Sequence, residues 1–219
     1  RRGPRLVPSA GGWAIRAGAY FEVSIEAGHG ESPPGAPAPC VAVGVCTGDL
    51  PLRGRQPGWT RSSWAYHGDD GRAFHGSGTT GVSFGPAFGA GDVIGCGVVP
   101  AGEDLLAVYF VRNGQALGVA FLVEERHELR RRDLYPVVGI DSARLRCVVN
   151  VGFGAPFALD DARLRHHERQ LCQGAAWARG LPPGLASLDD SDDDGSSDAD
   201  SMTDSLPASD SSLEPVGEA

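Results

Sequence analysis

The stretch LLAVYFVRNGQALGVAF, residues 105–121, carries the strongest fold signal in this sequence. Two apolar runs, Leu105–Arg112 and Gln115–Phe121, flank the dipeptide Asn113-Gly114. Asn-Gly between two such runs predicts a hairpin, because a type I′ turn needs a positive φ at both central positions. We therefore expect two antiparallel strands joined at this dipeptide.

Short apolar runs separated by turn residues continue on both sides of the hairpin. The chain has 32 glycines and 16 prolines, which interrupt these runs at short intervals. About nine short strands at this spacing predict an all-β fold, an antiparallel β-sandwich. Besides the hairpin, we expect strands at residues 20–26, 41–46, 63–67, 72–75, 92–99, 134–140 and 144–151.

The two ends of the chain differ from this strand pattern. Residues 1–19 form a glycine-rich lead-in, the sandwich is expected over 20–157, and Asp160-Asp161 would cap a helix within 158–180. Residues 181–219 are rich in Ser and Asp and contain no aromatic residue. Such a segment buries too little apolar surface to offset its ordering entropy, so we predict a disordered acidic tail.

The tail also carries most of the net charge of −9. Eleven Asp and Glu and no Arg follow from Ser187 onward, which leaves 17 acids and 19 arginines before it. Serines with an acid three positions later resemble sites of an acidophilic kinase of the casein kinase 2 type, although a solvating tail without regulated phosphorylation explains them as well. These serines are Ser187, Ser191, Ser197, Ser201 and Ser211.

Composition excludes several classes of partner. The nearly neutral folded part lacks the basic stripe that a nucleic-acid reader needs, and residues 130–132 are the only run of three arginines. No stretch approaches the 18 apolar residues of a membrane span. The five cysteines are odd in number and have no C-x-x-C spacing, which argues against a disulfide framework or a zinc site and indicates the cytoplasm or nucleus.

One turn concentrates residues that could carry chemistry. His67, Asp69, Asp70 and His75 could bind a divalent ion, but flanking glycines indicate a tight turn in which Asp bonds the backbone. Ser63, His67 and Asp69 could form a hydrolytic triad, but no nucleophile-elbow motif contains them. We therefore predict no catalytic residue, no metal and no cofactor.

Several ordered motifs resemble one family. They are PGW (57–59), AYHGDDG (65–71), FGP (84–86), GDVIGCG (91–97), YFVRNG (109–114) and LYPVVG (134–139). In this order they are similar to the SPRY domain of the Ran-binding protein M group, and FHGSG (74–78) is especially similar to SPRY domain-containing protein 3. The resemblance implies two packed antiparallel sheets and a role in protein recognition. Some relatives serve as substrate receptors or scaffolds in ubiquitin-ligase assemblies.

The resemblance also implies a binding face. Other SPRY domains bind extended peptides with loops at one edge of the sandwich, and seven residues here match that position. They are Leu52, Arg53, Arg55, Phe74, His75, Asp141 and Ser142. We expect a non-catalytic adaptor that captures a protein or short peptide. The alternatives are a carbohydrate-binding sandwich, for which Asn113 and Asn150 are the only asparagines, and the hydrolase.

Overall fold

The computed structural model describes residues 6–9, 12–15, 19–30, 35, 37–102, 105–124, 129, 133–152 and 155–172. Its elements are β1 (Leu6–Ser9), β2 (Gly12–Ile15), β3 (Ala19–Ala27), β4 (Val41–Thr47), β5 (Ser63–His67), β6 (Arg72–His75), β7 (Val82–Ser83), β8 (Val93–Gly102), β9 (Leu105–Arg112), β10 (Gln115–Glu124), β11 (Leu134–Ile140), β12 (Leu145–Asn150) and α1 (Asp161–Cys172). All nine strands expected from the sequence are present. Strands β1, β2 and β7 are additional, and the first two lie in the lead-in.

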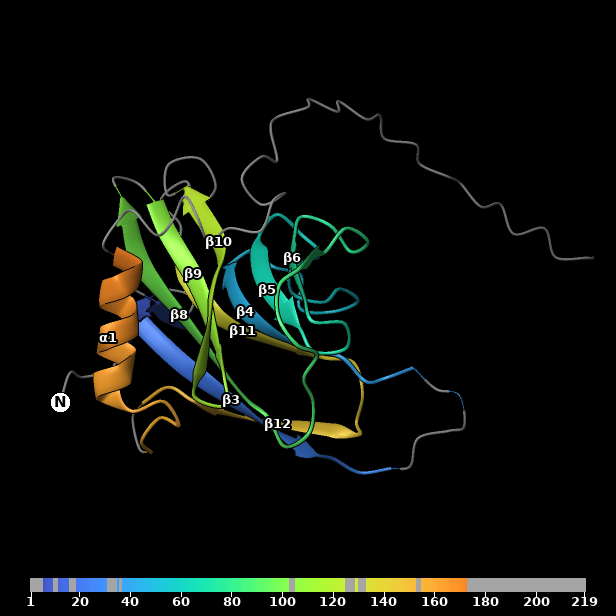
Figure 1. Cartoon of the computed structure of the whole chain (residues 1–219). Coiled ribbons are helices and arrows are strands. Elements are labelled where there is room, and N and C mark those ends of the chain that lie inside the picture. The colour runs from blue at the N-terminus through green and yellow to red at the C-terminus, as the bar shows by residue number, and fades with distance from the viewer. Residues whose placement is uncertain are drawn as a thin grey trace, which may run out of the picture. The chain divides into compact units, whose positions relative to one another are not determined.

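The strands form two antiparallel sheets that face each other as two layers (Figure 1). The seven-stranded sheet has the order β1-β2-β11-β4-β5-β6-β7, and the five-stranded sheet has the order β10-β9-β8-β3-β12. Alternate residues of both sheets point between the layers and are almost fully buried, as the two-residue period of a strand requires. This core includes Phe21, Val23, Val43, Val45, Trp64, Tyr66, Ile94, Val108 and Phe110. The predicted antiparallel sandwich is confirmed.

The hairpin of β9 and β10 turns where the sequence predicted. Arg112 pairs with Gln115, and the two residues between them, Asn113 and Gly114, have φ values of 51° and 75°. Positive φ at both positions is the requirement of a type I′ turn. This local expectation is therefore confirmed.

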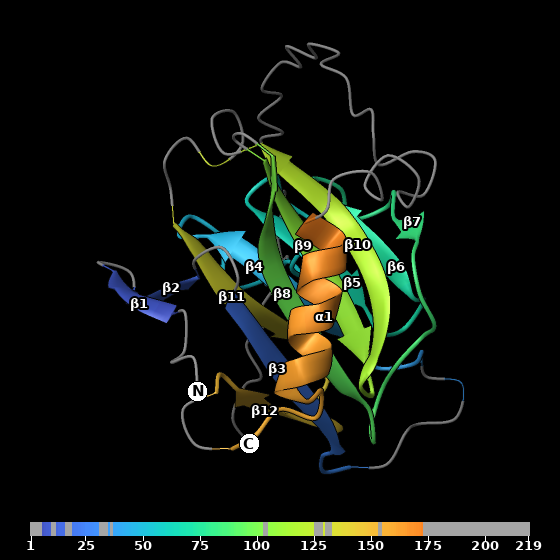
Figure 2. The same ribbon diagram turned by 60° about the vertical axis from the view of Figure 1, so that its left-hand side comes forward.

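The outer face of the five-stranded sheet is covered by helix α1, which lies across β8, β9 and β10 (Figure 2). Apolar residues of the sheet and helix form a second core, which contains Tyr20, Val99, Ala107, Tyr109, Val111, Val119, Leu159 and Leu164. The Asp160 carboxylate accepts hydrogen bonds from the backbone N–H groups of Ala162 and Arg163, both at 2.9 Å, as an N-cap does. The predicted helix therefore packs back on the sandwich.

The remainder of the predicted helix, residues 173–180, and the predicted disordered tail lie outside the described residues. Among the residues that are described, no helix has both the length and the apolarity needed to cross a membrane.

Candidate functional site

The loop of residues 48–62 lies on the outer face of the seven-stranded sheet. Ala42 on β4 and Ala65 on β5 point to that face, yet both are fully buried. On β11, a Cβ at Gly139 would collide with the side chain of Gln56 and the ring of Pro57. The loop therefore reaches from β5 across to β11, and Gly139 gives it room to approach.

Hydrogen bonds hold the base of this loop to β5. The His67 ring donates from Nε2 to the Pro57 carbonyl oxygen at 2.7 Å. The Gly58 N–H donates to Ser63 Oγ, also at 2.7 Å. Gly58 has a φ of 92° and lies so close to Phe74 that a Cβ there would have no space. The loop base is thus fixed by backbone contacts at both ends of β5.

The outer part of the loop projects into solvent. Leu52 has 86% of its surface exposed, which is the highest value among the exposed large apolar residues described. Arg53 and Arg55 on either side of Gly54 are also exposed. We call Leu52–Arg55 the loop tip. An exposed leucine followed by two exposed arginines is chemistry suited to contact with another molecule.

The other predicted binding residues occupy different environments. Phe74 is 6% exposed, and its ring packs against His67 with the ring centroids 4.3 Å apart. His75 stacks on Trp64 at 4.6 Å, and its Nδ1–H donates to the Ser63 carbonyl oxygen at 2.9 Å. Phe74 therefore lies on the outer face beneath the loop, whereas His75 lies on the opposite face of the sheet beside Trp64 of the core.

Asp141 and Ser142 lie just after β11, at the end of the sandwich where β4 begins. The Asp141 carboxylate accepts a hydrogen bond from the Cys40 N–H at 2.9 Å. Ser142 Oγ accepts from the backbone N–H and the Nε–H of Arg144, at 3.2 and 3.1 Å. Asp141 is exposed and lies two residues from Gly139, the contact point of the loop. Asp141 is also close enough to act electrostatically on His67, which bonds the loop base.

At the same end, two segments bring Cys40, His67 and Asp69 together. One ligand-type atom from each residue lies within 4.8 Å of the others, and Cys40 Sγ is 3.7 Å from His67 Nδ1. Sequence reasoning had grouped His67 and Asp69 with Asp70 and His75, and it missed Cys40. Nothing in the residue pattern placed Cys40 there; the pairing of β4 with β5, which sets Ala42 opposite His67, brings it close.

Burial decides the protonation states in this cluster. It lowers the pKa of His67, against the opposing effects of the Pro57 hydrogen bond and the nearby carboxylates, so the ring is neutral near pH 7. Burial raises the pKa of Cys40 to about 12, and Asp69 adds to the rise. The Cys40 side chain is therefore a thiol, not the thiolate that a nucleophilic cysteine needs.

The geometry does not assemble the hydrolytic triad. Ser63 and His67 are four residues apart on the extended strand β5, a separation of about 13 Å at ~3.3 Å per residue. The ring nitrogens of His67 contact the Pro57 carbonyl and Cys40 Sγ, and Ser63 Oγ contacts Gly58 and Thr60. His67 therefore does not reach the Ser63 hydroxyl as a base.

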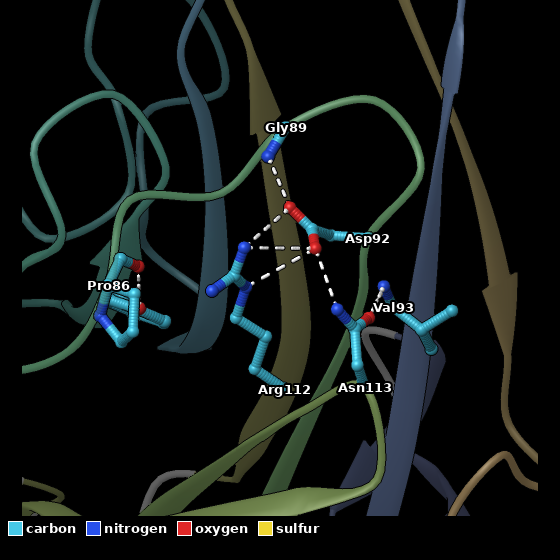
Figure 3. Close-up of polar contacts among 7 residues, drawn as sticks. Pro86, Gly89, Asp92, Val93, Arg112 and Asn113 are labelled. Carbon is cyan, nitrogen blue, oxygen red and sulfur yellow. Dashed lines mark hydrogen bonds and ion pairs between the residues drawn. The ribbon is translucent and has the colours of Figure 1, made fainter.

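A network around Asp92 braces the neighbouring loop, residues 84–92 (Figure 3). The Asp92 carboxylate accepts hydrogen bonds from Gly89 N–H at 2.9 Å, from Asn113 Nδ2 at 2.8 Å and from the Arg112 guanidinium at 3.3 Å. The Asn113 amide oxygen accepts from Val93 N–H at 2.8 Å. The network joins the start of β8 to the β9–β10 turn.

Asp92 is ionised as a consequence of these contacts. Burial by itself would raise the pKa of its carboxyl group, but the hydrogen bonds from Gly89, Asn113 and Arg112 and the guanidinium charge outweigh it, so the pKa is lowered. Figure 3 also shows the Pro86 carbonyl, which accepts a hydrogen bond from the Tyr66 hydroxyl. The loop is therefore held at both of its ends.

Both asparagines serve turns. Asn113 bonds Asp92 and Val93, while the Asn150 amide donates to the Ala155 and Pro156 carbonyls and accepts from Gly152 N–H. Neither amide is directed at an open sugar-binding platform by these contacts. The geometry provides no support for the carbohydrate-binding alternative.

Comparison with known proteins identifies the family that has this two-layered architecture. The SPRY domain family matches residues 19–153. Ran-binding protein 9 of Xenopus laevis is 39% identical over 121 residues, which cover 55% of this chain and 20% of that protein. Human Ran-binding protein 9 is 41% identical over 107 residues, covering 48% and 13%. The dual specificity protein kinase splA of Dictyostelium discoideum is 34% identical over 139 residues, covering 64% and 5%.

A solved structure described as the crystal structure of a human SPRY domain is 24% identical, with a TM-score of 0.48, and covers 69% of this chain and 98% of that one. The chain spans one fifth or less of the length of the curated relatives it matches. The relatives found include Ran-binding proteins 9 and 10, so the similarity to SPRY domain-containing protein 3 stays a prediction. With the family matched over most of the two-layered sandwich, the chain belongs to the SPRY domain family.

Proposed function

We propose that this protein is a non-catalytic adaptor that captures a segment of another protein with the loop tip and the adjacent Asp141-Ser142 segment. SPRY domains are typically protein-interaction modules, and the family is assigned here. The observation that carries the proposal is the contrast within one loop. Leu52 is 86% exposed and is followed by two exposed arginines, Arg53 and Arg55, while Pro57 and Gly58 a few residues later are buried against the sheet.

The rigid loop base favours binding energetically. A loop that is already held by hydrogen bonds and packing loses less conformational entropy when a partner orders it. Arg53 and Arg55 supply planar, charge-assisted donors, and Leu52 supplies apolar area that a partner can remove from water. This chemistry suits a protein segment that offers carboxylates beside an apolar side chain.

The role of the buried members follows from their positions. Phe74 supports Gly58 from beneath, and His75 supports β5 through Trp64 and Ser63. We therefore propose that Phe74 and His75 act on the partner through the shape of the loop, whereas Leu52, Arg53 and Arg55 contact it.

The test begins with peptides selected from a random display library on the immobilised full chain. A selected peptide is titrated by calorimetry against the wild type, Arg53→Glu and Arg146→Glu. Arg146 is a matched control, because it is an exposed arginine on β12 with 70% of its side chain accessible. We expect Arg53→Glu to weaken binding by about thirtyfold or more, since hot-spot arginines cost ~2 kcal/mol or more, with the unfolding temperature unchanged.

Arg146→Glu should bind like the wild type. Equal binding by both variants would show that the loop tip is the wrong surface, and a library that yields no binder would remove the recognition role.

We extend the proposal to a cytoplasmic or nuclear adaptor or substrate receptor of a ubiquitin-ligase-type assembly. Its test is whether the captured protein becomes ubiquitylated in cells in a manner that Arg53→Glu abolishes. An acidophilic kinase remains the partner proposed for the serines from Ser187 onward.

A further inference from the structure

The cluster of Cys40, His67 and Asp69 has the features of a metal site, and it lies outside the loop tip. Cys40 directly precedes β4, His67 ends β5, and Asp69 belongs to the turn before β6. Their ligand atoms all lie within 4.8 Å of one another. Two segments that are distant in sequence, Cys40 and the stretch 67–69, therefore converge on one point.

The orientation of His67 presents a free ligand atom to that point. Its Nε2 lies 2.7 Å from the Pro57 carbonyl oxygen, which can only accept, so Nε2 carries the proton. In the neutral ring, Nδ1 then has its lone pair directed at Cys40 Sγ. A histidine that binds a metal commonly donates its other N–H to a backbone carbonyl in this way, which fixes the tautomer.

The separation of the atoms agrees with tetrahedral zinc. Bond lengths of about 2.3 Å to sulfur and 2.0–2.1 Å to nitrogen at the tetrahedral angle place the two ligand atoms ~3.6 Å apart. Cys40 Sγ and His67 Nδ1 are 3.7 Å apart. A thiol hydrogen bond to the ring has a similar length, so the test must distinguish the two.

The surroundings suit a cation that enters from solvent. Cys40 and His67 are buried, whereas Asp69 is exposed and opens the cluster to water. The carboxylates of Asp69, Asp70 and Asp141 all act electrostatically on His67. A set of one sulfur, one nitrogen and one oxygen ligand favours a borderline ion such as Zn²⁺ over Mg²⁺ or Ca²⁺, which prefer oxygen alone.

We propose that Cys40 Sγ, His67 Nδ1 and the Asp69 carboxylate bind a Zn²⁺-type ion, with the fourth position open to water or to a partner's side chain. On binding, the Cys40 thiol releases its proton to solvent and coordinates as the thiolate. Because His67 also bonds Pro57, the ion would tie the start of β4 and the β5–β6 turn to the base of the 48–62 loop.

The experiment uses the full chain, reduced and stripped with a chelator, and Co²⁺ as a spectroscopic probe. We expect a near-ultraviolet thiolate-to-cobalt charge-transfer band that Zn²⁺ displaces. Cys40→Ser should abolish the band, whereas Cys46→Ser should retain it. Cys46 is a matched control, because it is a buried cysteine on β4 outside the cluster.

Asp69→Asn supplies a second variant that does not depend on the packing of a buried thiol. We expect it to weaken Co²⁺ binding by about tenfold or more, in the range that loss of metal-site partners causes, while Asp70→Asn, which removes a nearby charge but no ligand, should weaken binding much less. A wild-type protein without a charge-transfer band in excess Co²⁺ has only the thiol hydrogen bond, and the proposal is then wrong. A band that persists in Cys40→Ser also overturns it, because another cysteine is then the ligand.

Discussion

Replacement of Glu22 by Gln tests how helix α1 is held to the sandwich. Glu22 lies on β3 with 4% of its surface exposed. Its carboxylate accepts three hydrogen bonds, from the Tyr20 hydroxyl at 3.0 Å and from the N–H groups of Ala158 and Leu159 at 2.6 and 3.1 Å. The last two residues lead directly into α1. One side chain therefore holds the connection between the sheet and the helix.

The loss of stability expected for Glu22→Gln follows from the number of hydrogen-bond donors around the side chain. All three partners of the carboxylate donate, and Gln offers one acceptor oxygen and one donor group. In either amide orientation one backbone N–H faces an NH₂ group and loses its partner: the partly buried Ala158 N–H in one orientation, or the buried Leu159 N–H in the other. An orphaned buried donor costs ~1–3 kcal/mol, and the bonds that remain lose their charge assistance, about 1 kcal/mol each.

Removal of a buried charge recovers part of this cost, because the carboxylate no longer has to be desolvated. We expect a net loss of about 2–3 kcal/mol. For a chain of this size, that loss lowers the unfolding temperature by ~4–12 °C.

The assay is urea and thermal unfolding of the full chain, with hydrogen exchange of the α1 amides. Amides of α1 should exchange faster in Glu22→Gln, while those of β9 stay protected. Glu26→Gln is the matched control, because Glu26 lies on the same strand with 49% of its side chain exposed, 3.5 Å from Arg146. Exposed ion pairs contribute ~0–1 kcal/mol, so the control should stay close to wild type. Equal stability of both variants would refute the reasoning.

Two further variants test the loops. Asp92→Asn should lower the free energy of unfolding by about 1–2 kcal/mol at pH 7, because charge-assisted bonds to Arg112 are lost. The pKa of Asp92 is lowered on folding, so its contribution is present above the ordinary value of 3.8 and disappears as the pH falls through the lower folded value. Wild type and variant should therefore converge in stability in acid, and a difference that persists there would contradict the assignment. Gly139→Val should displace Gln56 and Pro57 from β11 and weaken peptide capture in calorimetry, whereas undiminished binding would show that the loop base does not position its tip.

The sequence was sufficient for features that depend on neighbouring residues. Alternating apolar runs set the nine strands, because the side-chain period of a strand is two residues. The Asn113-Gly114 turn followed from the φ preference of these residues. The N-cap at Asp160 followed from the orphaned N–H groups at a helix start.

Only the tertiary structure decided which residues meet across the sheets. The sequence grouped Phe74 with Arg53 as contact residues, but the packing of the 48–62 loop buries Phe74 beneath Gly58. It also gave no sign that Cys40 lies against His67, or that Glu22 bonds the backbone 136 residues later. Such contacts depend on sheet order, strand register and the path of a long loop, which residue periodicity does not encode.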